Sequence, residues 1–377
     1  MIFQNSITVL KPALVLILGL MLFGCADSDD MASEEMEHEE MDASHTMAME
    51  PNAELEAIKQ AVRDFKAAQW DPERSEMAYE LFAPDYVNLR SEFRNLEFNA
   101  DDPALAAIAD PMIVAIPDRQ DVIEEILAED NIVGVQTRIT GTHEGNLYGI
   151  PATGKAIDIV STAFYTFEDG KIVEAWEMAD EAGLLRQIEQ WLPERSDGLT
   201  IAPAINHPVD YGAQVLVDIL AHPEDSDTYT NKVRVSSYKA SIRPRNQEDP
   251  YLRPTDQVFD GRPYEVYKRR GFFHVADRSM ELGTNDQGMG GAFPDRIDMV
   301  GKLIAEGDKV MISFLLSAHN TGSLFGIPPS NQPVGGWEVG VHTFEGTTWT
   351  EGWWFGDDLG VLMQIGAPGD FLIPNAM

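Results

Sequence analysis

The chain has 377 residues, of which 63 are acidic and 27 basic, giving a formal net charge of −36. This balance argues against nucleic acid as a partner, because binding to phosphates needs clustered Lys and Arg, and against anionic lipid head groups. One cysteine excludes an intramolecular disulfide, so the fold must depend on core packing alone.

The first predicted element is a targeting segment, residues 1–24. Its apolar run, Pro12–Phe23, is too short to cross a bilayer as a helix. The run ends in Leu22-Phe23-Gly24-Cys25, which resembles the bacterial lipobox. That resemblance implies cleavage before Cys25 and two or three lipid chains on the new N-terminus, which anchor a protein firmly. We therefore expect a lipid-anchored protein of the bacterial cell envelope, on the periplasmic or extracellular face. The alternative is an ordinary secretory signal with an incidental cysteine.

Residues 25–51 are predicted to be a disordered acidic tether. The stretch Ala26–Glu50 has ten Asp or Glu, no Lys or Arg and no aromatic residue, so it cannot bury enough apolar surface to offset its chain entropy. It also contains Met31, Met36, His38, Met41, His45, Met47 and Met49. Such side chains could bind copper, or the segment is a solvated spacer.

Residues 52–196 read as one folding unit in which helices precede strands. Apolar residues at helical spacing predict a helix over Ala53–Gln69, a short helix follows over Ser75–Phe82, and Asp118–Ala128 reads as a helix capped by Asp118. Alternation then predicts an antiparallel meander of three strands, which gives the unit an α+β class. The strands are Asn131–Glu144, Lys155–Phe167 and Ile172–Ala179, and a closing helix covers Glu181–Gln190.

Residues 197–228 are predicted to be a linker, with a helix over Val215–Leu220, and residues 229–377 a second, divergent unit. Asn231–Ile242 is compatible with a helix, and Pro263–Met280 is predicted to be helical. The stretch Arg243–Arg262 is irregular and Gly283–Gly291 is glycine-rich.

The two units are copies of each other. Ile116–Glu189 recurs as Phe293–Gly366 at a constant offset of 177 without a gap, as expected of one fold present twice, because a strand slipped by one residue turns its core side chains outward. Both copies keep Glu174/Glu351, Trp176/Trp353 and Asp180/Asp357. Glu174 and Trp176 have the opposite strand parity to Glu177, so we expect them to be scaffold or to contact the other copy. Asp180 is expected to cap the closing helix.

A long ordered set of motifs resembles the SnoaL-like polyketide cyclase (ester cyclase) family. The resemblance covers most of Ala53–Glu189 and extends over Phe293–Gly366. The motifs are Pro84-Asp85-Tyr86-Val87-Asn88, Gly141-Thr142-His143-Glu144-Gly145, Gly149-Ile150-Pro151-Ala152-Thr153-Gly154-Lys155 and Asp169-Gly170-Lys171-Ile172-Val173-Glu174-Ala175-Trp176, followed by Asp180 and Gly183-Leu184-Leu185-Arg186-Gln187.

The resemblance implies two tandem cone-shaped α+β barrels, of the type shared with nuclear transport factor two. Members of the family usually pair through the outer face of the sheet, and two copies in one chain could form that pair internally. We therefore expect either a monomeric pseudo-dimer or a homodimer.

The resemblance also implies an acid/base site without metal or cofactor, in which Glu177 matches the catalytic carboxylate. A carboxylate in an apolar cone has a raised pKa, which suits proton transfer near neutral pH. Ala163 and Ala175 stand where the family has two supporting histidines, which puts the polyketide reaction itself in question. Asn88 matches a pocket asparagine. The alternatives are a strand carboxylate facing water and a loop asparagine.

Two further residues of the first copy share the predicted pocket face by strand parity. His143 follows the parity of Val133, Val135 and Ile139, so it is a catalytic candidate or a core histidine. Tyr165 alternates with Ala163 and should face the same side as Glu177.

The second copy has Trp354 where the first has Glu177, and an indole cannot exchange a proton as a carboxylate does. We therefore expect the second copy to be inactive. His342 stands opposite Tyr165 in the repeat, and Trp337, Trp353 and Trp354 accompany it. These residues form either an aromatic ligand pocket or a Trp-rich core.

Two functions follow from the sequence. The first is cofactor-independent acid/base chemistry, as in a cyclase, lyase or isomerase, on a small apolar carbonyl compound in the first copy. The second is a lipoprotein that binds a small hydrophobic molecule without turnover. The fold alone cannot choose between them, because this scaffold supports many functions.

Overall fold

The computed structural model describes residues 52–71, 73–108, 112–199, 211–240, 267–269, 289–367 and 369. The chain divides into residues 1–50 and one compact unit, residues 51–377. The targeting segment, Cys25 and the acidic tether lie outside the described residues, as do Arg243–Arg262 and most of the predicted helix Pro263–Met280. Within the described ranges, no helix is long and apolar enough to cross a membrane.

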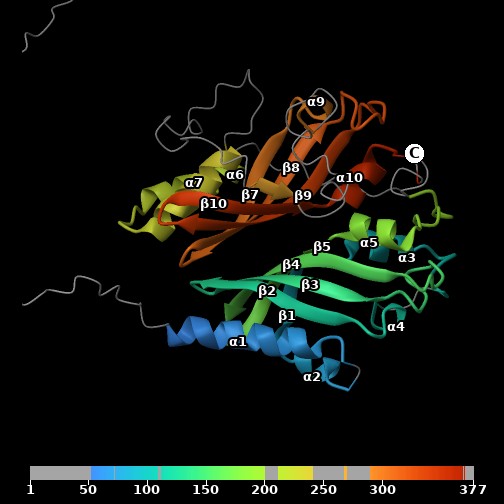
Figure 1. Cartoon of the computed structure of the whole chain (residues 1–377), viewed down its shortest axis with the longest axis horizontal. Helices are drawn as coiled ribbons and strands as arrows, with labels where there is room; N and C mark the ends of the chain where they lie inside the picture. Colours follow the sequence, from blue (N-terminus) through green and yellow to red (C-terminus); the bar gives the residue numbers. More distant parts are fainter. Residues whose placement is uncertain are drawn as a thin grey trace, which may run out of the picture. The chain divides into compact units, whose positions relative to one another are not determined.

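The first copy is a five-stranded sheet with helices, as the α+β prediction requires (Figure 1). The strand order is β1-β5-β4-β3-β2, with β1 parallel to β5 and the other pairs antiparallel. The strands are β1 (Phe82–Arg90), β2 (Gln120–Glu129), β3 (Ile132–Thr142), β4 (Ala156–Glu168) and β5 (Lys171–Ala179). The helices are α1 (Ala53–Ala68), α2 (Ser75–Tyr79), α3 (Arg94–Ala100), α4 (Met112–Ala115) and α5 (Glu181–Ile188).

The second copy has the same sheet topology, with the order β6-β10-β9-β8-β7. Its strands are β6 (Tyr267–Arg269), β7 (Ile297–Glu306), β8 (Lys309–His319), β9 (Pro333–Glu345) and β10 (Thr348–Gly356). Its helices are α6 (Tyr211–Ala221), α7 (Asp227–Ala240), α9 (Met289–Ala292) and α10 (Asp358–Gln364). Helix α6 falls within the predicted linker and packs against β7 and α7.

The predicted helix Asp118–Ala128 is wrong, because this segment is strand β2. A register shift between Ile123 and Glu125 interrupts its pairing with β3, and such a bulge changes which face the following residues occupy. Apolar residues on both sides of the bulge therefore fall at helix-like spacing. Asp118 does not cap a helix: its carboxylate accepts from the backbone N–H of Thr142, at 2.6 Å, and from its hydroxyl. The structure also corrects two other predictions. Strand β1 occupies a segment for which the sequence predicted no element, and Tyr267–Arg269, part of a predicted helix, is a strand.

The two sheets pack against each other through one apolar layer. It contains Leu127, Val160, Phe164, Trp176 and Met178 of the first copy and Ile304, Met311, Val339, Val341 and Phe355 of the second. The Trp176 and Trp337 rings lie edge to face, with centroids 5.5 Å apart. At Gly134 a Cβ atom would come within 2.8 Å of Ile304 Cδ1. Glycine at this position lets the sheets approach closely, because a larger residue would push them apart.

Contacts between the copies repeat in a reciprocal pattern. Lys59 pairs with Glu306 at 2.6 Å, and Lys232 pairs with Glu129 at 2.8 Å. Glu306 also accepts from the backbone N–H of Ala128, while Glu129 accepts from that of Ala305. Glu129 and Glu306 are related by the 177-residue repeat. Each contact between the copies is therefore repeated by the equivalent residues with the two copies exchanged. This reciprocity is typical of a two-fold interface, here within one chain.

Helix α7 is the counterpart of α1, at a different offset. Phe65-Lys66-Ala67 returns as Tyr238-Lys239-Ala240, and Lys59 returns as Lys232, both at an offset of 173 rather than 177. The repeat therefore extends to the first helix, with four residues more between helix and sheet in the second copy.

Candidate functional site

One face of the first sheet is covered by α1 and carries the predicted catalytic residue. Register places Ala163 beside Glu177 and Tyr165 beside Ala175, and side chains two residues apart on a strand share a face. These four residues therefore face one side. Val62 and Phe65 of α1 pack onto Ala163, Tyr165 and Ala175 there. Because Ala163 and Ala175 are small, they leave the space around Glu177 to longer side chains from α1.

Glu177 is held by a hydroxyl and an ammonium group. The buried Tyr165 hydroxyl donates a hydrogen bond to Glu177 Oε1, and Lys66 Nζ lies 3.6 Å from the same oxygen. The Lys66 side chain is buried, whereas 21% of the Glu177 side chain is exposed. The carboxylate is therefore desolvated but still open on one side to an incoming molecule.

Burial raises the pKa of Glu177 above its ordinary value. Lys66 opposes the rise, the Glu92 carboxylate adds to it, and the hydrogen bond from Tyr165 opposes it again. Burial also raises the pKa of Tyr165 well above its usual range, with a further contribution from Glu177. The phenol therefore stays protonated and acts as a donor to the carboxylate. A carboxyl group with a raised pKa can both take and return a proton near neutral pH.

The structure places the two other predicted catalytic residues, Asn88 and His143, at different distances from Glu177. Asn88 pairs with Ala175 across β1 and β5, which puts it on the Glu177 face, but its side chain is exposed. His143 lies beyond the end of β3, where its backbone pairs with Lys155. It is eight residues along the chain from Val135, the residue that register aligns with Ala163, which is about 26 Å of strand. The structure does not bring His143 to Glu177.

His143 instead occupies a buried corner of the fold. Its Nδ1 is 3.0 Å from the Thr153 hydroxyl, while its Nε2 is buried without a hydrogen-bond partner. Burial lowers its pKa, and the backbone of Gly145 opposes the change. These contacts tie the end of β3 to the turn before β4, which fits a core histidine.

Sequence reasoning missed Lys66 and Glu92. Lys66 was overlooked because the apolar positions alone defined its helix, although its return as Lys239 is a signal that could have found it. Glu92 follows β1 in a segment without a recognisable pattern, and only the structure shows that it is buried and acts on Glu177.

In the second copy the equivalent face is filled by aromatic side chains. Trp354 and His342 are fully buried, with ring centroids 4.3 Å apart, and Trp349 lies 4.7 Å from His342. Lys239 Nζ lies 3.9 Å from the centroid of the Trp354 ring. Burial lowers the pKa of Lys239 to about 8 and holds the pKa of His342 well below its usual range. The described part of this face is packed and carries no carboxylate at the Glu177 position.

The predicted grouping of three tryptophans with His342 is wrong in part. Trp337 contacts Trp176 of the first copy. Trp353 pairs with Val341, which belongs to the layer between the sheets. Only Trp354 shares the face of His342, because neighbouring residues on a strand point to opposite sides.

The residues that both copies keep lie at the contact between the copies or cap helices. Trp176 packs on Trp337, and the Glu174 carboxylate accepts from Lys302. Asp180 accepts from the Gly183 N–H at 2.9 Å, and Asp357 from the Gly360 N–H at 3.0 Å. Glu351 and Trp353 hold the matching positions on β10.

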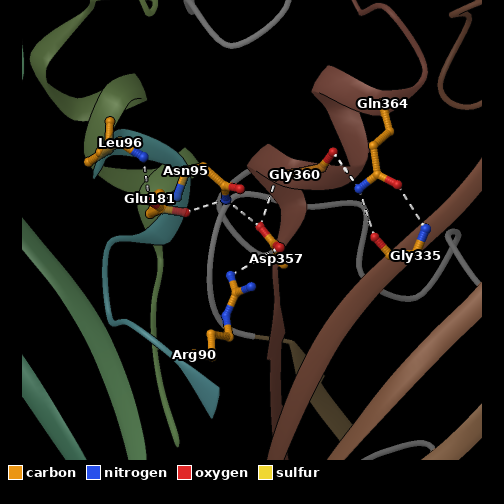
Figure 2. A network of polar contacts seen from close by, with 8 residues as sticks. All are labelled: Arg90, Asn95, Leu96, Glu181, Gly335, Asp357, Gly360 and Gln364. Atoms are coloured by element: carbon orange, nitrogen blue, oxygen red, sulfur yellow. Dashed lines mark hydrogen bonds and ion pairs between the residues drawn. The ribbon is translucent and has the colours of Figure 1, made fainter. Parts of the chain in front are cut away.

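Asp357 also joins the copies through a buried polar network (Figure 2). Arg90 of β1 lies 3.0 Å from its carboxylate, and the Asn95 amide donates to it at 2.7 Å. Asn95 donates as well to Glu181, which accepts from the backbone N–H groups of Asn95 and Leu96. Burial and the nearby Asp357 raise the pKa of Glu181 to about 8, against the influence of Arg90. Two buried carboxylates thus share one amide, and one of them also pairs with a guanidinium.

In the part of the chain that the structure describes, no group of three or more His, Cys, Asp and Glu side chains is arranged to hold a metal ion.

Solved structures similar to this chain each cover about a third of it. TsrD from Streptomyces laurentii is 21% identical, covering 35% of this chain and 95% of its own, with a TM-score of 0.26. AclR from Streptomyces galilaeus is 23% identical, covering 36% and 97%, with a TM-score of 0.29. IdmH from Streptomyces antibioticus is 21% identical, covering 34% and 97%, with a TM-score of 0.27. No curated protein matches the chain.

The family model of the SnoaL-like polyketide cyclases matches in two segments, residues 60–188 and 282–365. The segments correspond to the two copies and together exceed half of the 377 residues. The chain therefore belongs to the SnoaL-like polyketide cyclase family, with two copies of the family fold in one polypeptide.

Proposed function

We propose that the first copy is a cofactor-independent acid/base enzyme acting on a small carbonyl compound, with Glu177 as the proton-transferring group. The observation that carries the proposal is the environment of Glu177, a desolvated and partly accessible carboxylate with a raised pKa, fixed by Tyr165 and Lys66. The second copy has Trp354 at this position and serves as a structural partner.

The elementary step is removal of a proton from the carbon next to a carbonyl group. Glu177 takes the proton, the electrons of the C–H bond form the enolate C=C bond, and the negative charge moves to the carbonyl oxygen. Protonated Glu177 then returns the proton to the product. Tyr165 and Lys66 hold the carboxylate, which positions it for transfer.

The step is measurable on a simple ketone in D2O, because each abstraction replaces an α-proton by deuterium. We expect the full chain to accelerate exchange of the CH2 protons of 2-hydroxyacetophenone. Proton NMR measures the exchange as loss of the CH2 signal. The rate should rise with pH, because the base is the carboxylate, and its midpoint should lie above the usual glutamate pKa of 4.5. A rate equal to that of buffer at every pH would refute the proposal.

The alternative is a binding protein that holds a small hydrophobic molecule without turnover. The missing pair of histidines at Ala163 and Ala175 favours it. Attachment to the bacterial cell envelope through Cys25 is also a proposal, motivated by the lipobox-like sequence. Mass spectrometry of the mature N-terminus tests it, since a free amine on an earlier residue would exclude lipidation there.

A further inference from the structure

A second polar cluster lies on the Glu177 face, where the chain leaves the C-terminal end of α1. Lys66 reaches Glu177, while Gln69 and Trp70, three and four residues later, donate to Asp121 at 3.3 and 3.0 Å. Residues at this spacing lie on the same side of a helix, about 5.4 Å apart along its axis. Asp121 pairs with Ile139, whose parity on β3 is that of Val135 and therefore of the Glu177 face. The two clusters share one face of the fold.

Arg119 is fixed in this second cluster. Its Nε and Nη2 donate to the two oxygens of Asp121 at 2.7 and 2.9 Å, and its guanidinium carbon lies 3.7 Å from the centre of the Trp70 ring. Bidentate pairing and stacking leave a guanidinium little freedom. Arg119 Nη1 is buried and has no hydrogen-bond partner. A buried donor left unpaired costs about 1–3 kcal/mol, so this nitrogen is ready to bind an acceptor.

Glu92 supplies the complementary acceptor. Its Oε2 lies 3.6 Å from Arg119 Nη2, and its Oε1 is buried without a partner. Only 7% of Glu92 is exposed. One ion pair thus presents an unused donor and an unused acceptor.

Comparison with the second copy shows which contacts of this cluster belong to the shared scaffold. It keeps the arginine–aspartate pair as Arg296 and Asp298, at 2.6 Å, so the pair itself is scaffold. Arg296 also pairs with Glu338, at 3.4 Å. In the first copy the arginine pairs instead with Glu92, and Arg119 Nη1 and Glu92 Oε1 are both buried without a partner. This is the copy that also carries Glu177.

The cluster and Glu177 act on one intervening side chain. Tyr79 is half-exposed; partial burial raises its pKa to about 12, the carboxylates of Glu177 and Glu92 add to the rise, and Arg119 opposes it. The Tyr79 ring packs against Phe65 and Phe82, which border Tyr165. Phe65, Phe82 and Tyr79 thus form an aromatic group beside Tyr165, the hydroxyl donor to Glu177.

We propose that the Arg119–Glu92 pair binds the polar end of the substrate, and that this end is a neutral hydroxycarbonyl group. The carbonyl oxygen accepts from Arg119 Nη1 and the hydroxyl donates to Glu92 Oε1. Because Glu92, Asp121 and Glu177 face one arginine and one lysine, a carboxylate ligand meets net repulsion. The proposal rests on the proposed function only in calling the bound molecule a substrate, because the same contacts would bind it without turnover.

The test compares three ligands that share a phenyl ring, using ligand-observed NMR on the full chain. The neutral 2-hydroxyacetophenone should bind about tenfold more tightly than acetophenone, which lacks the hydroxyl, and than mandelate, which is anionic; a tenfold ratio corresponds to 1.4 kcal/mol. Failure of 2-hydroxyacetophenone to bind, or equal dissociation constants for it and acetophenone, overturns the proposal.

Variants of Glu92 test whether the Arg119–Glu92 pair causes the preference for 2-hydroxyacetophenone. Glu92→Leu should reduce the ratio to about one, while Glu92→Gln, whose amide oxygen still accepts, should keep most of it. Arg296→Gln is the matched control in the second copy and should leave the ratio unchanged. Thermal unfolding of each variant confirms that it is folded. A preference that survives Glu92→Leu in folded protein contradicts the assignment.

Binding and turnover fail separately in this design. Glu177→Gln should keep the tenfold preference and lose deuterium exchange. Preference without exchange in the wild-type chain would refute the proposed function and leave this inference standing. Exchange without preference would refute this inference alone.

Discussion

Replacing Glu177 by Gln is expected to lower the rate of α-proton exchange on 2-hydroxyacetophenone by roughly 10²–10⁴-fold, the usual contribution of a positioned general base. The amide has almost the same shape and still accepts a hydrogen bond from Tyr165, but it cannot take a proton. Proton NMR in D2O gives the rate constant for both proteins at equal concentration.

Glu174→Gln is the matched control for this substitution. It lies on the same strand, three residues away, and pairs with Lys302 on the opposite face. Part-exposed pairs of this kind contribute about 1 kcal/mol or less, so the exchange rate should stay within about twofold of the wild-type value. A comparable loss in Glu174→Gln, or none in Glu177→Gln, would contradict the assignment of the base.

The second large effect is expected on stability, in Arg90→Met. Removal of this guanidinium leaves the buried Asp357 carboxylate without its ion-pair partner, next to the buried Glu181 (Figure 2). Breaking a buried ion pair from one side typically costs about 3–5 kcal/mol. Urea denaturation should show that loss in the free energy of unfolding.

The loss should depend on pH in a definite direction. The pKa of Glu181 in the folded protein, about 8, lies above its ordinary value of 4.5. The folded state therefore binds the proton more tightly, and the contribution of Glu181 to stability is present at low pH and lost as pH rises from 4.5 towards 8. Since Arg90 counteracts the charge that appears at high pH, Arg90→Met should cost more at pH 8 than at pH 5.

Arg138→Met is the control for the stability measurement. Arg138 also pairs with a carboxylate, Asp158, but half of each side chain is exposed. Exposed pairs contribute at most about 1 kcal/mol, so this variant should lose little stability at either pH. Equal losses in the two variants would mean that the buried network does not join the copies as described.

The sequence predicted the meander and the closing helix of the first copy correctly because they depend on local signals. Alternating strands, a D-G hairpin at Asp169-Gly170 and the cap at Asp180 act within a few residues. The prediction of a helix in place of strand β2 was wrong for a local reason too. The bulge near Glu125 changes the face that the apolar residues occupy, so their spacing resembles that of a helix.

The extent of the repeat was underestimated because its offset changes. A search at 177 aligns the sheets but misses α7, whose residues match α1 at 173. Had Lys66 and Lys239 been aligned, the lysine beside Glu177 would have appeared as a shared feature. Its different surroundings, a carboxylate in one copy and Trp354 in the other, would then have marked the site.

The geometry of the candidate site could be predicted only where strand parity decides it. Parity placed Glu177, Ala163, Ala175 and Tyr165 on one face. Parity also shows that Trp353 and Trp354 point to opposite sides, a signal that was present in the sequence. Parity does not give distance along a strand, which is why His143 was grouped with a site that lies far from it. Glu92 reaches the site through tertiary packing alone.

The most direct test of the central claim, that the first copy turns over a molecule rather than merely holding one, is native mass spectrometry of the full chain purified without denaturant. A co-purified molecule should appear as a mass increment in both the wild-type chain and Glu177→Gln. On incubation, the wild-type increment should change or disappear as the molecule is converted, and the variant increment should persist. An increment that persists unchanged in both proteins would contradict the account and identify a binding protein.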